Sequence, residues 1–183
     1  TVTDEEVRIS SFEQFSLRNY EGQLYLYGSA DGFGSGYWNI FYVNAPTVEE
    51  LGEKLRDTDN WNTIFPNTTY EKDPSVFKFN NEYYMAYTGS STAYQTVFVK
   101  SSSPTFSDFE LISRDITRKY QERYSFGNKI STGTFFKSHG KFFYWASAII
   151  PSSKDVYWIF MVSDDLENWT YSNRILAVED WSD

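Results

Sequence analysis

Residues 76–88 read VFKFNNEYYMAYT, a strand-like run, a turn at Asn80-Asn81 and a second run dense in aromatic side chains. Tight hairpin turns need residues that tolerate positive φ, and asparagine is one of the few. Segments 17–29 (LRNYEGQLYLYGS) and 135–147 (FFKSHGKFFYWAS) align with this hairpin without gaps, so that Gly22, Asn81 and Gly140 are spaced 59 residues apart. The same spacing found twice, with matching flanks, predicts three copies of one structural unit.

Each hairpin is followed by further strand-forming sequence. Third strands are expected at 38–43, 96–100 and 156–162, and shorter fourth strands near Trp61, Phe109 and Trp169. Four antiparallel strands per copy is the arrangement of a propeller blade. Residues 46–56 (PTVEELGEKLR) are expected to form a helix inside the first copy, because they open with Pro and acids and end with bases.

The sequence therefore predicts an all-β fold of the β-propeller type, with about three four-stranded blades in a single domain over residues 1–183. The repeats are expected at about 12–65, 71–114 and 130–176. Because propellers close with roughly 4–8 blades, three blades make an incomplete ring. We expect the remainder of a longer propeller, or a homo-oligomer, to complete it. Residues 6–10 (EVRIS) are a candidate outer strand for a blade that is otherwise supplied elsewhere.

Composition excludes several classes of function. Acidic residues outnumber basic ones to give a formal net charge of −9, which disfavours nucleic acid and anionic membranes as partners. No apolar run approaches the roughly 20 residues that a membrane span needs. Cysteine is absent, so disulfides and a cysteine nucleophile are excluded. Aromatic residues make up 20% of the chain, which suits twisted antiparallel sheet and also suits platforms for sugar rings.

Asp73 is the best-placed candidate for chemistry. It stands before Pro74 at the head of the innermost strand expected at 75–79, where it would point into the pocket on the propeller axis. A carboxylate at this place suits a general base or a group that tunes the pKa of a neighbour. The structural alternative is that Asp73 caps a turn, since Asp-Pro is a common turn pair.

Residues 71–88 resemble the Asp-Pro segment that opens a blade in glycoside hydrolase family 43 and related five-bladed propeller families. Residues 163–169 (SDDLENW) are similar to the turn that ends blades in these enzymes. The resemblance implies a carbohydrate substrate and three carboxyl groups, which are an Asp base, a second Asp that modulates pKa, and a Glu acid. It also slightly favours an extracellular or periplasmic location.

Transferring these roles to this chain gives Asp73 as a catalytic carboxylate and Glu13 as a candidate acid. The positions aligned with Asp73 in the other two repeats hold Gln14 and Thr132, and Ser131 precedes Thr132. Two functions therefore remain open. The first is a hydrolase that acts on glycosidic bonds of plant or microbial polysaccharide or oligosaccharide. The second is a non-catalytic, lectin-like propeller fragment or subunit that binds carbohydrate.

Aromatic residues at strand ends and loops are candidate sugar platforms, and the sequence suggests no organic cofactor. A structural calcium ion stays open at three groups of acids, although their spacing matches no defined loop and solvated acids are the simpler interpretation. These groups are Asp57/Asp59, Asp164/Asp165 and the tail residues Glu179, Asp180 and Asp183. The candidate substrate-binding residues are Phe33, Tyr37, Trp38, Tyr94 and Trp145.

Overall fold

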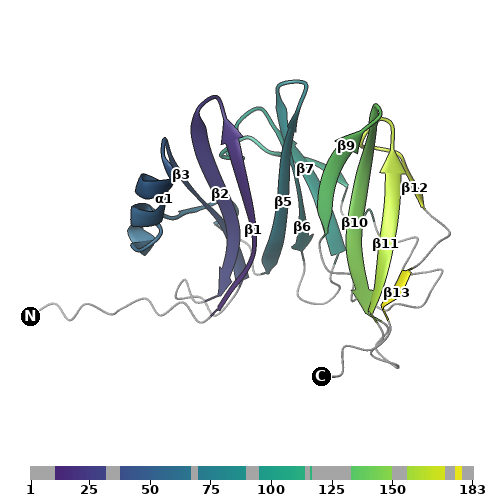
Figure 1. Cartoon of the computed structure of the whole chain (residues 1–183), viewed down its shortest axis with the longest axis horizontal. Helices are drawn as coiled ribbons and strands as arrows, with labels where there is room; N and C mark the ends of the chain where they lie inside the picture. The colour runs from purple at the N-terminus through teal and green to yellow at the C-terminus, as the bar shows by residue number, and fades with distance from the viewer. Residues whose placement is uncertain are drawn as a thin grey trace, which may run out of the picture.

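The computed structural model describes residues 11–31, 38–66, 70–89, 95–113, 116, 133–149, 156–171 and 176–178. Its strands form three antiparallel sheets that stand side by side in chain order (Figure 1). Sheet I has the strand order β1-β2-β3-β4 and sheet II the order β5-β6-β7-β8. Sheet III has the order β12-β11-β10-β9, with β13 also paired to β11. These sheets confirm the prediction of an all-β, incomplete propeller.

The elements have the following bounds: β1 Ser11–Tyr20, β2 Gln23–Asp31, β3 Trp38–Ala45, α1 Val48–Lys54, a 3-10 turn Thr58–Asn60, β4 Asn62–Thr63, β5 Glu71–Phe79, β6 Glu82–Gly89, β7 Gln95–Ser101, β8 Glu110–Ser113, β9 Thr134–Ser138, β10 Lys141–Ile149, β11 Val156–Ser163, β12 Trp169–Tyr171 and β13 Leu176–Val178. No helix in the described part of the chain is long and apolar enough to cross a membrane.

The three predicted hairpins are present, and each turns through two residues with positive φ. The pairs are Glu21 and Gly22 at 57° and 85°, Asn80 and Asn81 at 49° and 62°, and His139 and Gly140 at 49° and 77°. Two consecutive positive φ values match the right-handed twist of the flanking strands, which explains the residue types at the 59-residue spacing. The lone histidine is accordingly a turn residue whose ring nitrogen contacts the Ser138 hydroxyl.

The third and fourth strands lie where the sequence places them, with one difference. In sheet III the fourth position beside β11 is divided between β12 and β13, which pair with opposite ends of β11. The predicted helix is also present as α1. It starts two residues after Pro46, because the Thr47 side chain accepts a hydrogen bond from the Glu50 N–H and caps the first turn.

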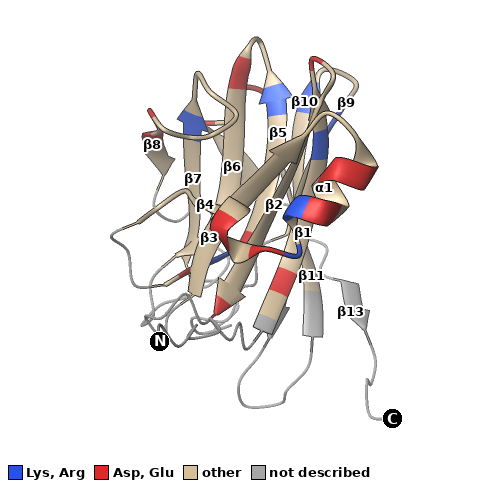
Figure 2. Cartoon of the chain, turned by 90° about the vertical axis from the view of Figure 1, so that its left-hand side faces the viewer, with Lys and Arg blue, Asp and Glu red and all other residues tan. Residues whose placement is uncertain are grey.

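The core consists of aromatic and aliphatic layers between neighbouring sheets. Sheets II and III enclose Phe98, Phe135 and Tyr144, and sheets I and II enclose Tyr27 and Met85. These side chains are at most 5% exposed. A third layer lies on the outer face of sheet I, where α1 packs Leu51 against Phe41 and Val43 (Figure 2, which shows the charged side of α1). Blade-to-blade packing therefore accounts for most of the aromatic excess.

Strand β5 begins earlier than expected, at Glu71 rather than at Ser75. The sequence analysis places this strand at 75–79, directly after Pro74, which has no N–H to donate to a ladder. Instead, the register with β6 shifts between Lys72 and Ser75, so Pro74 lies within a β-bulge where no ladder hydrogen bond is required of it. Asp73 lies in the same bulge and has a positive φ of 60°.

Candidate active site

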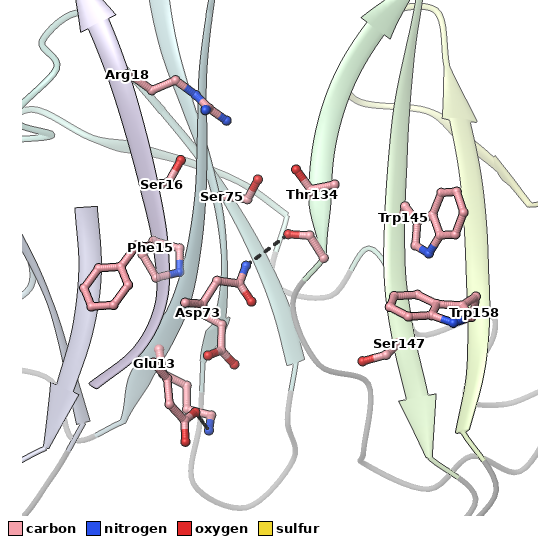
Figure 3. Close-up of a pocket in the computed structure, with 14 residues that line it drawn as sticks. Glu13, Phe15, Ser16, Arg18, Asp73, Ser75, Thr134, Trp145, Ser147 and Trp158 are labelled. Atoms are coloured by element: carbon pink, nitrogen blue, oxygen red, sulfur yellow. Dashed lines mark hydrogen bonds and ion pairs between the residues drawn. The ribbon is translucent and has the colours of Figure 1, made fainter. Parts of the chain in front are cut away.

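A cavity of about 710 Å³ is lined by the innermost strands β1, β5 and β9 and by residues of β10 and β11 (Figure 3). Two of its charged side chains are basic, Arg18 and Lys72, and two are acidic, Glu13 and Asp73. The other lining residues are Gln14, Phe15, Ser16, Pro74, Ser75, Gly133, Thr134, Trp145, Ser147 and Trp158. Both predicted catalytic carboxylates therefore lie on one cavity.

Two β-bulges lie in the strands that line this cavity. The bulge of β1 lies between Glu13 and Ser16, and the bulge of β5 lies between Lys72 and Ser75, 59 residues later. The equivalent residues Gln14 and Asp73 have positive φ values of 40° and 60°. Such backbone is unfavourable by about 1–3 kcal/mol per residue and persists where the surrounding structure holds it, most often at functional sites.

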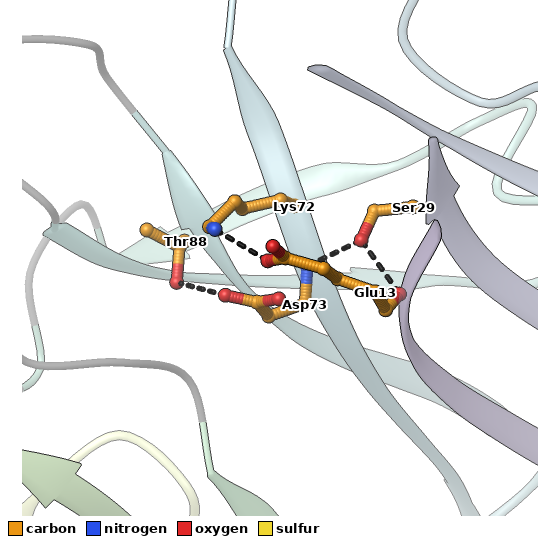
Figure 4. Close-up of polar contacts among 5 residues, drawn as sticks. All are labelled: Glu13, Ser29, Lys72, Asp73 and Thr88. Carbon is orange, nitrogen blue, oxygen red and sulfur yellow. Dashed lines mark hydrogen bonds and ion pairs between the residues drawn. The ribbon is translucent and has the colours of Figure 1, made fainter. Parts of the chain in front are cut away.

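Asp73 is a buried carboxyl group, only 5% exposed. Its backbone N–H donates to the Ser29 hydroxyl (3.1 Å), which itself donates to the Glu13 carbonyl oxygen (2.8 Å) (Figure 4). The Thr88 hydroxyl donates to Oδ2 at 3.4 Å. Burial raises the pKa of Asp73 to about 6; the Lys72 ammonium and the Thr88 hydrogen bond lower it, and the Glu13 charge raises it further.

Glu13 is engaged by Lys72. The Lys72 Nζ lies 2.5 Å from the Glu13 Oε2 and 4.9 Å from the centre of the Trp38 ring. Lys72 is 15% exposed along its side chain and Glu13 is 42% exposed. The two residues occupy equivalent positions in neighbouring repeats, so this ion pair joins sheet I to sheet II on the wall of the cavity. In this arrangement Glu13 accepts a hydrogen bond from an ammonium.

Gln14 occupies the place in sheet I that Asp73 has in sheet II. Its amide donates to the Gly133 carbonyl oxygen of the third repeat at 3.3 Å. The Gly133 N–H in turn donates to the Tyr144 hydroxyl (2.8 Å), and a Cβ at Gly133 would collide with the Trp145 carbonyl group. Gln14 thus links the first and third sheets and brings no carboxylate to the cavity. Ser131 and Thr132, the remaining aligned positions, lie outside the described residues.

Of the predicted sugar platforms, Trp145 lies on the cavity and is 37% exposed. Trp158, which the sequence analysis missed, lies beside it with ring centres 5.6 Å apart. The strand register could have indicated Trp158. It pairs across β10 and β11 with Ser147, which also lines the cavity and lies two residues after Trp145. Trp38 is not one of the cavity-lining residues and packs under Lys72 instead. Phe33, Tyr37 and Tyr94 lie outside the described residues.

Within the described ranges, no three His, Cys, Asp or Glu side chains gather in a way that could hold a metal ion. The carboxylates of Asp57, Asp164 and Asp165 have other partners, and Glu179, Asp180 and Asp183 lie outside the described residues. Asp57 accepts from the Asp59 N–H, and Asp164 pairs with Lys141 at 2.8 Å. Asp165 accepts from the side chain and backbone of Asn168, and these hydrogen bonds hold its pKa below the usual range. The structure gives these acids local roles in turns.

The cavity combines features that a sugar site needs. It offers hydroxyl and charged groups for hydrogen bonds, an indole surface for the apolar face of a sugar ring, and one buried carboxyl group. A carboxyl pKa of about 6 is close to the pH at which most enzymes work, and a general acid or base transfers protons best when its pKa lies near that pH. The site can therefore bind a polar ring compound and exchange one proton with it or with water.

No protein-family model matches the sequence, and no curated protein sequence is similar to it. Solved structures do share its fold. A thermostable family-43 glycoside hydrolase has 14% identity and a TM-score of 0.62, covering 88% of this chain and 54% of that one. The family 62 α-L-arabinofuranosidase catalytic domain of Coprinopsis cinerea has 12% identity and a TM-score of 0.63, covering 96% and 53%.

The native arabinanase of Bacillus subtilis has 16% identity and a TM-score of 0.57, covering 86% of this chain and 53% of that one. The fold is thus that of the five-bladed propeller glycoside hydrolases, and the chain spans about half the length of the structures it matches. This agrees with the resemblance seen in residues 71–88 and with the three blades counted from the repeats.

Proposed function

We propose that this chain contributes the cavity wall and one proton-transferring carboxyl group, Asp73, to the active site of a glycoside hydrolase. The observation that carries the proposal is the position of Asp73, buried in a bulge at the head of an innermost strand, on the wall of a cavity with an indole surface. The names of the similar structures, an arabinofuranosidase and an arabinanase, support arabinosyl linkages as the first substrates to test.

In this mechanism Asp73 acts as the general base. Above its pKa of about 6 the carboxylate accepts a proton from a water molecule as the water oxygen bonds to the anomeric carbon. The glycosidic C–O bond breaks at the same time, and the leaving oxygen takes a proton from a separate acid. Thr88, which donates to Oδ2, keeps the carboxylate in one orientation.

Within this chain, Glu13 is the candidate for the acid. Glu13 lies on the same cavity, but its Oε2 accepts from the Lys72 ammonium in the present geometry. Donating a proton requires Glu13 to leave this ion pair and become protonated. The alternative is that a carboxyl group outside the described residues supplies the proton, with the Glu13–Lys72 pair serving to orient the wall beside Asp73.

A second function is favoured by one specific observation, the amide of Gln14 at the position equivalent to Asp73. A cavity with an amide in place of a further carboxylate, and with its second carboxylate, Glu13, held in an ion pair by Lys72, suits a carbohydrate-binding propeller without catalysis. This protein would use the same Trp145 and Trp158 surface and the same polar wall. The two functions differ only in turnover, so a single set of experiments separates them.

The test is hydrolysis by the full-length protein of arabinan, arabinoxylan and aryl arabinofuranosides and xylosides. We expect a rate that falls about tenfold per pH unit below pH 6, and a loss of about 10²–10⁴-fold in kcat in Asp73→Asn with sugar binding retained. Asp164→Asn, an exposed carboxylate in an ion pair with Lys141, is the matched control and should keep full activity. Wild-type protein that binds these glycans without turnover supports the binding function; equal rates in wild type and Asp73→Asn contradict the catalytic role.

A further inference from the structure

Arg18 places a positive charge on the cavity wall that no described acid neutralises. Its side chain lies toward one end of the cavity, and Asp73 and Glu13 lie toward the other (Figure 3). Lys72, the other basic residue of the cavity, is in an ion pair with Glu13. Among the described residues, no Asp or Glu forms such a pair with Arg18. A half-buried guanidinium without a carboxylate partner is a binding group for an anion from outside the chain.

The Arg18 guanidinium is held in one orientation by two backbone carbonyl groups. Its Nε donates to the Val76 carbonyl oxygen of β5 at 2.5 Å, and its Nη1 donates to the Leu17 carbonyl oxygen at 2.9 Å. The remaining N–H groups lie on both Nη atoms, and no described residue accepts from them. A carboxylate takes two parallel hydrogen bonds from such a planar group. The side chain is therefore oriented in advance and keeps donors for a ligand.

The structural alternative is that Arg18 only fastens sheet I to sheet II through Val76. The repeat argues against this, because the positions equivalent to Arg18 in the other two copies hold Phe77 and Phe136. Phe77 makes its contact with the next sheet through its ring, whose centre lies 5.3 Å from that of Phe135. A ring is thus sufficient to pack one sheet on the next at this position, and packing does not require the positive charge of Arg18.

Two buried hydroxyl groups extend the donor surface beside Arg18. The Ser16 Oγ in β1 accepts a hydrogen bond from the Val76 N–H at 3.3 Å, and the Ser75 Oγ in β5 accepts from the Phe135 N–H at 3.2 Å. Both serines line the cavity and are at most 5% exposed. Because each oxygen already accepts, its O–H hydrogen remains to donate, and no described residue accepts it. This part of the wall therefore matches a ligand group that only accepts hydrogen bonds, as a carboxylate does.

The acidic end of the cavity does not exclude an anion from the Arg18 end. The Lys72 ammonium compensates the Glu13 charge, so Asp73 is the acid without a cationic partner. Arg18 lies four residues further along β1 than Gln14, the repeat counterpart of Asp73. At about 3.3 Å per residue this separation is up to about 13 Å. It exceeds the screening length of about 8 Å at physiological ionic strength, so repulsion between Asp73 and an anion at Arg18 is weak.

We propose that Arg18 binds the carboxylate of an acidic sugar unit, a uronic acid, with the Ser16 and Ser75 hydroxyls donating to the same unit. The inference rests on the proposed carbohydrate site and applies equally to its hydrolytic and its binding form. Because Arg18 and Asp73 lie toward opposite ends of the cavity, the acidic unit is a neighbour of the sugar that meets Asp73. Arg18 is then a specificity residue that selects an acidic oligosaccharide over a neutral one.

The first experiment measures binding of matched acidic and neutral oligosaccharides to the full-length wild-type protein by calorimetry. The pairs are xylo-oligosaccharides with and without a glucuronic acid substituent, and galacturonic acid oligomers against galactose oligomers of the same length. We expect the acidic member to bind about tenfold or more tightly, the usual effect of a hydrogen-bonded charge pair. This preference should shrink as the salt concentration is raised to about 0.5 M, because the site is partly open to solvent.

The second experiment repeats the measurement on variants. Arg18→Gln removes the charge but keeps an amide that can donate to Val76, so it should lose the preference for acidic sugars by about tenfold and leave the affinity for neutral ones within about threefold. Arg18→Lys keeps the charge without the planar pair of donors and should retain part of the preference. Lys141→Gln removes an equal charge from an ion pair with Asp164 outside the cavity, and this control should behave as wild type.

The outcomes separate this inference from the proposed function. Neutral and acidic sugars that bind the wild type equally well overturn the role of Arg18 and leave the carbohydrate site standing, whereas binding of none of them overturns both. An Arg18→Gln variant that loses affinity for neutral and acidic sugars alike shows that Arg18 only fastens the two sheets. A sulfated galactose oligomer that binds as tightly as the galacturonic acid oligomer contradicts the choice of a carboxylate.

Discussion

Replacing Asp73 by asparagine should stabilise the protein at alkaline pH and leave its stability unchanged in acid. The ordinary pKa of an aspartate is 3.8, and burial raises that of Asp73 to about 6 in the folded chain. A folded-state pKa above the unfolded one means that the folded chain prefers the protonated carboxyl group. That preference stabilises the fold below pH 3.8 and is lost as the pH rises through about 6.

The magnitude follows from the size of the shift. Two pKa units correspond to about 3 kcal/mol, and about 2–3 kcal/mol of this develops between pH 4 and pH 8. Asparagine has nearly the same shape and carries no charge to desolvate. The variant is therefore expected to gain about 2–3 kcal/mol in unfolding free energy over the wild type as the pH is raised across this range. When removal of a functional group raises the unfolding free energy, the group is kept for its function although it destabilises the fold.

The assay is urea unfolding followed by tryptophan fluorescence at half-unit steps from pH 4 to pH 8. Asp164→Asn serves as the control, because its exposed ion pair with Lys141 should contribute less than about 1 kcal/mol at any pH. The reasoning is refuted if the difference between Asp73→Asn and wild type stays constant with pH. It is refuted equally if the variant gains stability towards acid.

Three further predictions follow from single contacts. Lys72→Met should raise the pKa of Asp73 further, because the Lys72 ammonium lowers it; an NMR titration of the carboxyl carbon measures the shift, and a lower pKa would contradict the assignment. Phe98→Ala should reduce the unfolding free energy by about 3–5 kcal/mol, since this ring is fully buried between sheets II and III; urea unfolding that shows under about 1 kcal/mol would refute that packing. Gly140→Ala should lower the unfolding free energy by about 1–2 kcal/mol because of its φ of 77°, whereas Gly52→Ala in α1 should raise it by up to about 1 kcal/mol. Both sites have open space for a Cβ, so the difference comes from the backbone. Changes of the same sign in the urea unfolding assay would contradict this argument.

Local sequence was sufficient to predict the blades. The turn residues at the 59-residue spacing and the alternation of the flanking strands act over fewer than about ten residues, and their geometry requires specific residue types. The three hairpins, the third strands and α1 are therefore present where the pattern places them. The repeat by itself also placed Asp73 at the head of an innermost strand, and the family resemblance added Glu13 as the candidate acid.

Contacts between blades were decided by the tertiary structure. The Glu13–Lys72 pair, the bond from Gln14 to Gly133 and the Ser16–Val76 contact each join residues 59 or more positions apart. Nothing in the local pattern constrains such pairs, since they depend on the register and angle at which whole sheets pack. The bulge that includes Pro74 and the burial that raises the pKa of Asp73 arise in the same way. Sequence determined what each blade is; the packing of blades determined what the cavity between them can do.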